Sequence, residues 1–278
     1  MIIDSHHHLW KFNTADYTWM DKSMSILKQD YLPADLEKQL IGSGIVGTVA
    51  VQARQNLEET RWLLEVAHQQ PFIKGIVGWV DLCSEELDAQ LEKFSKDPGL
   101  VGVRHVIHDE PDDDFMLRPA FLKGIEKLGQ YNLTYDLLLF PKHLQRAIEL
   151  VSLFPEQKFV LDHISKPFIK AGILDPWREE ISALAVRTNV WCKISGMLTE
   201  ADHKHWKYED FLPFLDVVVE AFGTDRIMLG SDWPVCLLAG EYHQVMDIPA
   251  RYFKDLDPVE MEKISRMNCI ECYELINH

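Results

Sequence analysis

Short runs of β-branched and aliphatic residues recur along the chain, and longer stretches with apolar residues at helical spacing separate them. These runs are residues 2–9, 45–51, 72–80, 100–106, 133–140, 159–161, 190–194 and 226–229. Apolar residues three and four positions apart in the intervening stretches predict amphipathic helices. Eight strands alternating with helices favour a parallel sheet, and this number is typical of an α/β fold of the closed (β/α)8 type, the TIM barrel.

Two segments stand outside this alternation. Residues 12–31 are too many for a simple connection, so we predict a lid-like loop or pocket wall after the first strand. Residues 258–276 have a helical pattern and predict a C-terminal helical tail. No linker composition interrupts the chain, so we expect a single domain over residues 1–278. The alternative, an open doubly wound sheet, would need a G-x-G-x-x-G phosphate loop, and none follows a strand here.

Composition narrows the class of protein. Apolar residues make up 47% of the 278 residues, enough for a large core, and the formal net charge of −16 argues against nucleic acid as a partner. No segment resembles a signal peptide and no apolar run could cross a membrane, so we expect a cytoplasmic protein without a membrane partner. The five scattered cysteines suit a reducing compartment. Monomer and homodimer both remain open.

Polar residues cluster where the predicted strands end, which is where (β/α)8 barrels place their active sites. His6 and His8 point the same way because side chains in a strand alternate, and two such imidazoles can hold a metal or polarise a carbonyl. The other strand ends carry Gln52, Arg54, Asp81, Arg104, His105, His108, Asp136, His163, Lys193, Ser195 and Asp232. A charge in a buried strand is costly unless it is paired, so convergence of these groups favours a functional site.

Single residues in this set also have purely structural interpretations. His163 could hydrogen-bond a neighbouring loop, and Asp232 could cap the turn at Trp233-Pro234. Arg104 could be a buried cation paired with Asp136 or Asp81. The sequence alone leaves these alternatives open for each residue.

The whole chain resembles the amidohydrolase superfamily. The shared pattern is His6-x-His8 on the first strand, His163 on a later strand and Asp232 on the eighth. Within the superfamily, the chain resembles the lactonase branch, which includes L-fuconolactonases, L-rhamnonolactonases and pyrone-dicarboxylate lactonases. The stretches that carry the resemblance are DSHHHLW (4–10), GVRH (102–105), DLL (136–138), VLDHISKP (160–167), CKISGM (192–197), TEAD (199–202) and GSDWPV (230–235).

The resemblance implies a hydrolase that opens the ester bond of a sugar-derived lactone to the hydroxy acid. Asp232 would be the general base, and His6, His8 and His163 would polarise the carbonyl. The same four residues would hold one divalent metal ion, with zinc as the expected metal, although the resemblance also allows catalysis without it. Dinuclear superfamily members use a carboxylated lysine on the fourth strand, where this chain has Arg104, so a two-metal centre is not expected.

We expect further side chains to bind a small-molecule lactone substrate, namely Arg104, Gln52, Asp136, Trp19 and Trp233. The fork of an arginine can bind a carbonyl or hydroxyl oxygen, and tryptophan can stack on a sugar ring. Three alternatives remain: a lactone of the pyrone or muconolactone type, a metal-dependent decarboxylase that clamps a carboxylate with Arg104 and Arg54, and a barrel that only binds a metabolite.

Overall fold

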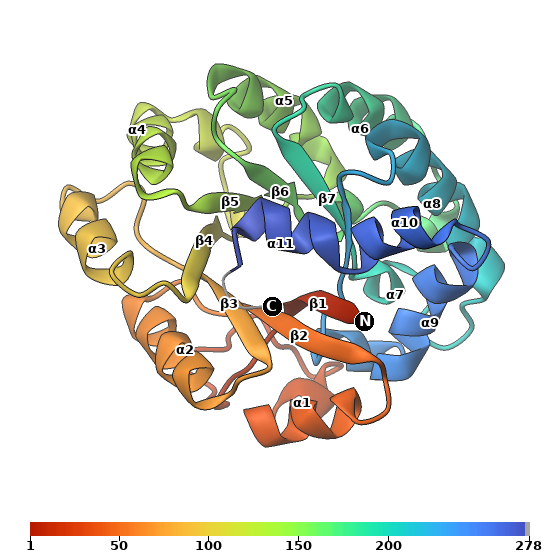
Figure 1. Cartoon of the computed structure of the whole chain (residues 1–278). Coiled ribbons are helices and arrows are strands. Elements are labelled where there is room, and N and C mark those ends of the chain that lie inside the picture. Colours follow the sequence, from red (N-terminus) through yellow and green to blue (C-terminus); the bar gives the residue numbers. More distant parts are fainter. Residues whose placement is uncertain (276–278) are drawn as a thin grey trace.

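The computed structural model describes residues 1–275 and contains one sheet of eight parallel strands in sequence order (Figure 1). The strands are β1 (Ile2–His7), β2 (Ile45–Val51), β3 (Ile73–Gly78), β4 (Leu100–His105), β5 (Thr134–Leu137), β6 (Phe159–Leu161), β7 (Val190–Ile194) and β8 (Ile227–Leu229). The first and last strands meet where Ser5 Oγ donates to the Leu229 carbonyl at 2.7 Å and the Asp232 N–H donates to the His6 carbonyl at 2.8 Å. The predicted (β/α)8 barrel is confirmed.

Helices surround the barrel (Figure 1), and their apolar residues are buried in the core beside it. Those that connect successive strands are α1 (Pro33–Leu40), α2 (Leu57–Gln69), α3 (Leu87–Phe94), α4 (Pro119–Leu128), α5 (Leu144–Leu153), α6 (Trp177–Ala185), α7 (Met197–Glu200) and α8 (Tyr208–Phe222). After β8 come α9 (Tyr242–Tyr252), α10 (Pro258–Glu262) and α11 (Asn268–Tyr273), the last two joined by a π-helical turn, Lys263–Met267. Leu63 of α2 and Ile181 of α6 are fully buried, as expected for core-facing helix positions.

Several predicted strands are longer than the observed ones. The runs 72–80 and 133–140 pair only over Ile73–Gly78 and Thr134–Leu137, because their ends leave the hydrogen-bonded ladder and turn into the loops. Two helices, α7 and α9, were not predicted: α7 is a single turn, and Pro249 lies inside α9, where a proline usually ends a helix. The helical tail is confirmed through Tyr273, whereas Ile276, at its predicted end, lies outside the described residues.

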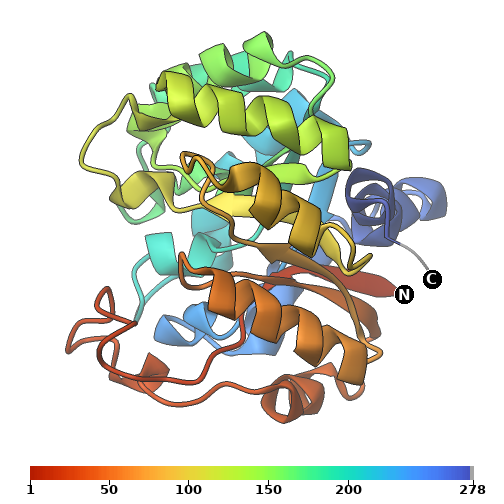
Figure 2. The same cartoon turned by 90° about the vertical axis from the view of Figure 1, so that its left-hand side faces the viewer.

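The two ends of the barrel are covered by different segments. Figure 2 shows the loop after β1 at one end and α10 with α11 at the other. The loop is fixed at its base by a bridge between Trp10 and Tyr31, whose backbone groups exchange two hydrogen bonds of 2.9 Å. Tyr17 and Met20 of the loop are buried, so the predicted lid is a packed wall. No helix within residues 1–275 is long and apolar enough to cross a membrane.

Candidate active site

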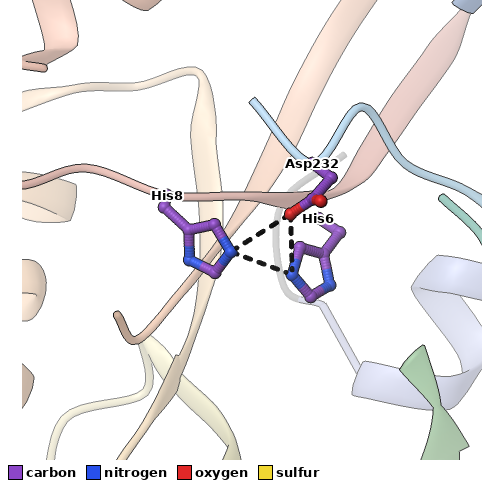
Figure 3. A group of neighbouring side chains, drawn as sticks. All are labelled: His6, His8 and Asp232. Atoms are coloured by element: carbon purple, nitrogen blue, oxygen red, sulfur yellow. Dashed lines mark hydrogen bonds and ion pairs between the residues drawn. The ribbon is translucent and has the colours of Figure 1, made fainter. Parts of the chain in front are cut away.

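Four polar side chains from three strand ends meet at the loop-covered end of the barrel. His6 and His8 come from the end of β1, His163 follows β6, and Asp232 follows β8. Asp232 Oδ1 lies 3.3 Å from His8 Nε2 and 3.8 Å from His6 Nε2 (Figure 3). It also lies 3.8 Å from His163 Nε2. His6 Nε2 and His8 Nε2 are 3.2 Å apart. The structure thus brings together the four residues predicted to be catalytic.

The backbone at these strand ends has an uncommon conformation. Asp232 and His163 both have φ of 54°, and the left-handed region continues through Ile164, Ser165 and Lys166. Aspartate and histidine tolerate this region better than most residues, but a β-branched isoleucine does not. Strained backbone of this kind clusters at functional sites, where packing holds it in place. The left-handed backbone from His163 to Lys166 therefore indicates that the segment after β6 belongs to a functional site.

A buried carboxylate fixes the chain beside Asp232. Asp4 Oδ1 accepts the backbone N–H of Ser231 at 2.9 Å, and Asp4 Oδ2 accepts the hydroxyls of Ser231 at 2.6 Å and Tyr242 at 3.0 Å. Burial raises the pKa of the Asp4 carboxyl despite these hydrogen bonds. Tyr242 comes from helix α9, which was not predicted. Through its hydrogen bond to Asp4, this helix helps to hold β1 beside the loop that carries Asp232.

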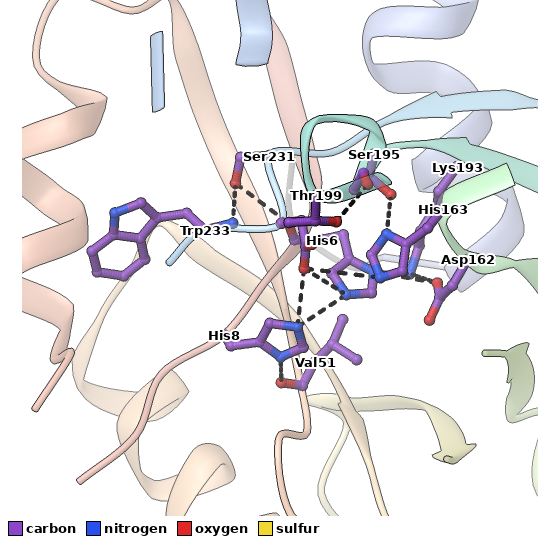
Figure 4. A network of polar contacts seen from close by, with 12 residues as sticks. His6, His8, Val51, Asp162, His163, Lys193, Ser195, Thr199, Ser231 and Trp233 are labelled. Atoms are coloured by element: carbon purple, nitrogen blue, oxygen red, sulfur yellow. Dashed lines mark hydrogen bonds and ion pairs between the residues drawn. The ribbon is translucent and has the colours of Figure 1, made fainter. Parts of the chain in front are cut away.

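Hydrogen bonds orient the rings of the three histidines. His8 Nδ1 donates to the Val51 carbonyl at 2.8 Å; because a carbonyl only accepts, Nε2 of a neutral His8 carries a lone pair. His6 Nδ1 lies 3.2 Å from Asp162 Oδ1, so His6 also turns Nε2 toward the site. His163 Nδ1 lies 2.8 Å from Ser195 Oγ (Figure 4). Burial lowers the pKa of His6 and His163 well below the ordinary value, which keeps both rings neutral.

Alanine at Gly196 should disturb this geometry. Gly196 has φ of 61°, and an added Cβ would lie 2.6 Å from His163 Nδ1. We expect the imidazole to shift away from Ser195 and kcat/KM to fall about a hundredfold, because small displacements of reacting groups are costly. The left-handed conformation should also lower the free energy of unfolding by about 1–2 kcal/mol.

Gly172→Ala is the matched control for this change. Gly172 has φ of 63°, but an added Cβ would meet no atom within 4 Å. Urea unfolding should therefore show a similar loss of stability, and steady-state kinetics should show no loss of activity. Equal activity of the Gly196 and Gly172 variants would contradict the role given to the His163 ring.

The donor atoms of the site suit one divalent cation. His6 Nε2, His8 Nε2 and Asp232 Oδ1 all lie within 3.8 Å of one another. His8 Nε2 and Asp232 Oδ1 present electron pairs, and His6 Nε2 does so in the tautomer whose Nδ1–H points to Asp162. Two histidines with one carboxylate are typical zinc ligands. His163 Nε2 lies 3.8 Å from the same oxygen, Asp232 Oδ1. These residues fit the single metal ion that the sequence predicted.

Arg104 lies next to the histidine cluster. Its Nη1 atom lies 3.0 Å from Asp162 Oδ2 and 3.4 Å from His6 Nε2, and Nη2 donates to the Gln52 carbonyl. Gln52 Nε2 donates in return to the Arg104 carbonyl at 3.2 Å, while Gln52 Oε1 has no hydrogen-bond partner among residues 1–275. A pairing of Arg104 with Asp136 or Asp81, which the sequence left open, is not what the structure shows. Within residues 1–275 the guanidinium pairs with Asp162, which follows β6, two strands away from β4 in the sheet.

The remaining predicted substrate contacts lie in different surroundings. Asp136 is fully buried and accepts hydrogen bonds from Lys193 Nζ at 2.6 Å and from the Tyr273 hydroxyl at 2.7 Å. Trp233 is 2% exposed and its ring packs edge-on against Tyr31. Trp19 in the loop is 38% exposed. Asp136 is therefore engaged inside the barrel, Trp233 supports the wall beside Asp232, and Trp19 keeps an open face.

Sequence reasoning gave no individual role to three residues that contact His6, Arg104 or Asp136 in the structure. These residues are Asp162, Lys193 and Tyr273. Two of them carried a signal. Asp162 directly precedes His163 at a strand end, and Lys193 lies inside an otherwise apolar buried strand, where a charge needs a partner. Tyr273 lies in the C-terminal helix, and only the folded structure brings it to Asp136.

A (β/α)8 barrel with a histidine–aspartate cluster at the carboxyl ends of its strands has the architecture of a TIM-barrel enzyme, because active sites of this fold lie at these ends. The chain belongs to the amidohydrolase family, whose model matches residues 3–275. It is an enzyme of the hydrolase class, and the family resemblance of its motifs is confirmed.

Two relatives and one solved structure are similar to this chain along most of its length. An L-fucono-1,5-lactonase of Burkholderia ambifaria is 36% identical over 243 residues, which are 86% of this chain and 82% of that protein. An L-fucono-1,5-lactonase of Burkholderia multivorans is 34% identical over 98% of this chain and 96% of its own length. A crystal structure of an amidohydrolase from Burkholderia multivorans, with zinc bound, has a TM-score of 0.96 at 34% identity and covers 99% of both chains.

Proposed function

We propose that this protein hydrolyses the ring ester of a sugar-derived lactone, and that its substrate class is an aldonolactone similar to L-fucono-1,5-lactone. The observation that carries the proposal is the Asp232 carboxylate, which lies 3.3 to 3.8 Å from three imidazole nitrogens at the strand ends. Two relatives named for this activity, at 34% and 36% identity, support the same substrate class. Such a reaction would place the enzyme in carbohydrate catabolism, with the cytoplasm as its expected location.

The proposed reaction begins with activation of water. Asp232 takes a proton from a water molecule as the water oxygen bonds to the lactone carbonyl carbon, and the carbonyl oxygen gains negative charge. Arg104 is the positive side chain beside this cluster, with Nη1 3.4 Å from His6 Nε2. If the Ser195 hydroxyl donates to His163 Nδ1, the His163 Nε2–H is free to donate to the same oxygen.

The second half of the reaction opens the ring. The bond between the carbonyl carbon and the ring oxygen breaks, and the alkoxide stays tethered to the new acid. Asp232 returns its proton to that alkoxide, so one carboxylate serves as both base and acid. His6, His8 and Asp232, with His163 beside them, would hold a zinc ion; when bound, zinc supplies a Lewis acid that polarises the carbonyl.

A lactone panel tests the proposal. Purified protein is assayed on aldono-1,4- and aldono-1,5-lactones and on pyrone- and muconolactone-type lactones, with a pH indicator to record the proton released as the acid forms. We expect fast turnover of a deoxy-sugar lactone, a loss of at least tenfold on dialysis against a chelator, and recovery with Zn²⁺. Turnover that resists the chelator would remove zinc from the mechanism. No turnover of any lactone, or release of carbon dioxide from an aromatic acid, would contradict the proposal.

A further inference from the structure

A buried lysine lies directly behind the candidate site. Lys193 comes from β7, and its side chain has no solvent exposure. Its Nζ atom lies 2.6 Å from Asp136 Oδ2, 3.1 Å from Asp162 Oδ1 and 3.3 Å from His6 Nδ1. Figure 4 shows the Lys193 side chain between His163 and Asp162, on the side of His6 that faces away from His8. The Lys193 ammonium therefore contacts the Nδ1 edge of the His6 ring, and the Nε2 edge of the same ring faces the site.

The C-terminal helix holds this lysine from the other end of the barrel. The Tyr273 hydroxyl of α11 donates to Asp136 Oδ2 at 2.7 Å, and Lys193 Nζ lies 5.3 Å from the centre of the Tyr273 ring. This distance allows a cation–π interaction. Figure 2 shows α11 at the barrel end opposite the loop-covered site. Polar contacts thus run through the barrel from Tyr273 to His6.

The charges in this cluster are paired by their positions. Lys193 Nζ lies 2.6 Å from Asp136 Oδ2 and 3.1 Å from Asp162 Oδ1, and Arg104 Nη1 lies 3.0 Å from the other oxygen of Asp162. A lysine ammonium has three N–H donors and no electron pair, so in this arrangement Lys193 donates to the carboxylates and cannot bind a metal.

The Lys193 ammonium contacts two of the three side chains that could hold a second metal ion. His6, Asp162 and His163 form a second group of potential ligands, each with one donor atom within 4.8 Å of the others. Lys193 Nζ contacts two members of this group, Asp162 and His6, and Arg104 contacts Asp162 from the other side. Two positive side chains at one carboxylate leave little attraction for a further cation.

We propose that Lys193 is a positioning residue: its ammonium takes the place of a second metal ion and, through Asp162, holds His6 with Nε2 turned toward His8 and Asp232. Tyr273 and Asp136 keep Lys193 in this position. The consequence for catalysis rests on the proposed lactone hydrolysis, whereas the consequence for metal binding does not. Partners behind a ligating histidine typically change metal affinity or activity by about 10–100-fold when they are removed.

Three variants test this assignment. Lys193→Met removes the cation but keeps an unbranched chain, and Tyr273→Phe removes only the hydroxyl that holds Asp136. Tyr135→Phe is the matched control, because its side chain is also buried in the barrel but its hydroxyl makes no hydrogen bond to Asp136, Asp162 or Lys193. Zinc-free proteins are titrated with Zn²⁺ in competition with a chromophoric chelator, and kcat and KM are measured on the best lactone.

Wild-type protein should bind one equivalent of Zn²⁺. Lys193→Met should weaken the zinc Kd at least tenfold, and Tyr273→Phe about threefold, with kcat falling in parallel and KM within about twofold of wild type. Tyr135→Phe should match wild type. Thermal unfolding shows whether Lys193→Met folds. If it does not fold, the zinc affinity and kcat of Tyr273→Phe decide whether the assignment holds. Two tight equivalents in wild type, no zinc binding, or a folded Lys193→Met or Tyr273→Phe with wild-type affinity and kcat would overturn the assignment. The titration uses no substrate, so it reads this inference separately from lactone turnover.

Discussion

Replacing Asp232 by asparagine should lower kcat on the lactone by about a thousandfold or more, because a general base contributes about 10²–10⁴ to the rate and an amide cannot accept the proton. The fold should persist. Asparagine tolerates the left-handed conformation of position 232, where φ is 54°, as well as aspartate does. The backbone contact of this residue, its N–H on the His6 carbonyl at 2.8 Å, is unchanged by the substitution.

Initial rates and thermal unfolding of the two proteins measure this effect. Asp255→Asn, at an aspartate whose side chain is 89% exposed, controls for the loss of one negative charge. It should leave kcat and the melting temperature at their wild-type values. An Asp232→Asn enzyme that keeps more than a tenth of wild-type kcat would remove Asp232 as the base.

Replacing Arg104 by lysine should lower kcat/KM by about a hundredfold. The guanidinium contacts Asp162 Oδ2 at 3.0 Å and the Gln52 carbonyl through separate nitrogens while Nη1 lies 3.4 Å from His6 Nε2. A lysine keeps the charge, and so avoids an unpaired buried carboxylate, but it cannot make these contacts together. Transition-state stabilisation by one such donor is worth about 10²–10³ in rate.

Arg226→Lys is the matched control, because it also replaces a guanidinium that donates several hydrogen bonds by an ammonium. Arg226 donates to the carbonyls of Ala185, Arg187 and Val190 at 2.8–3.0 Å, around the start of β7. Its replacement should lower the melting temperature without changing kcat/KM. If Arg104→Lys likewise changed only stability, Arg104 would be a structural cation, which is the other interpretation that the sequence allowed.

The barrel could be predicted because its strands leave a strong pattern. Parallel strands buried on both faces are continuous apolar runs, and β2, β6 and β7 match their predicted bounds residue for residue. The pair His6 and His8 could be predicted because strand side chains alternate. His163 and Asp232 lie two and three residues after predicted strands, and the family resemblance singled them out among the strand-end residues. These local patterns give the placement of the candidate site without any knowledge of contacts between distant residues.

The polar contacts inside the barrel could not be predicted in the same way. Asp136 was expected to face substrate, yet Lys193 and Tyr273 occupy its oxygen, and Tyr273 comes from a segment 137 residues away. The partner of Arg104 was missed for the same reason, because Asp162 follows β6, two strands away from β4, and strand order alone does not show that its carboxylate reaches the guanidinium. Helix α9, which has Pro249 inside it, was also not predicted.

The most direct test of the account is the initial rate of hydrolysis of a deoxy-sugar 1,5-lactone by the wild-type protein, with the Asp232→Asn variant as the baseline for spontaneous ring opening. We predict a kcat/KM above about 10⁴ M⁻¹s⁻¹, within the range of ordinary enzymes on their own substrates, with one proton released per lactone opened. A wild-type rate equal to that of the Asp232→Asn baseline, across both ring sizes and with Zn²⁺ added, would contradict the account.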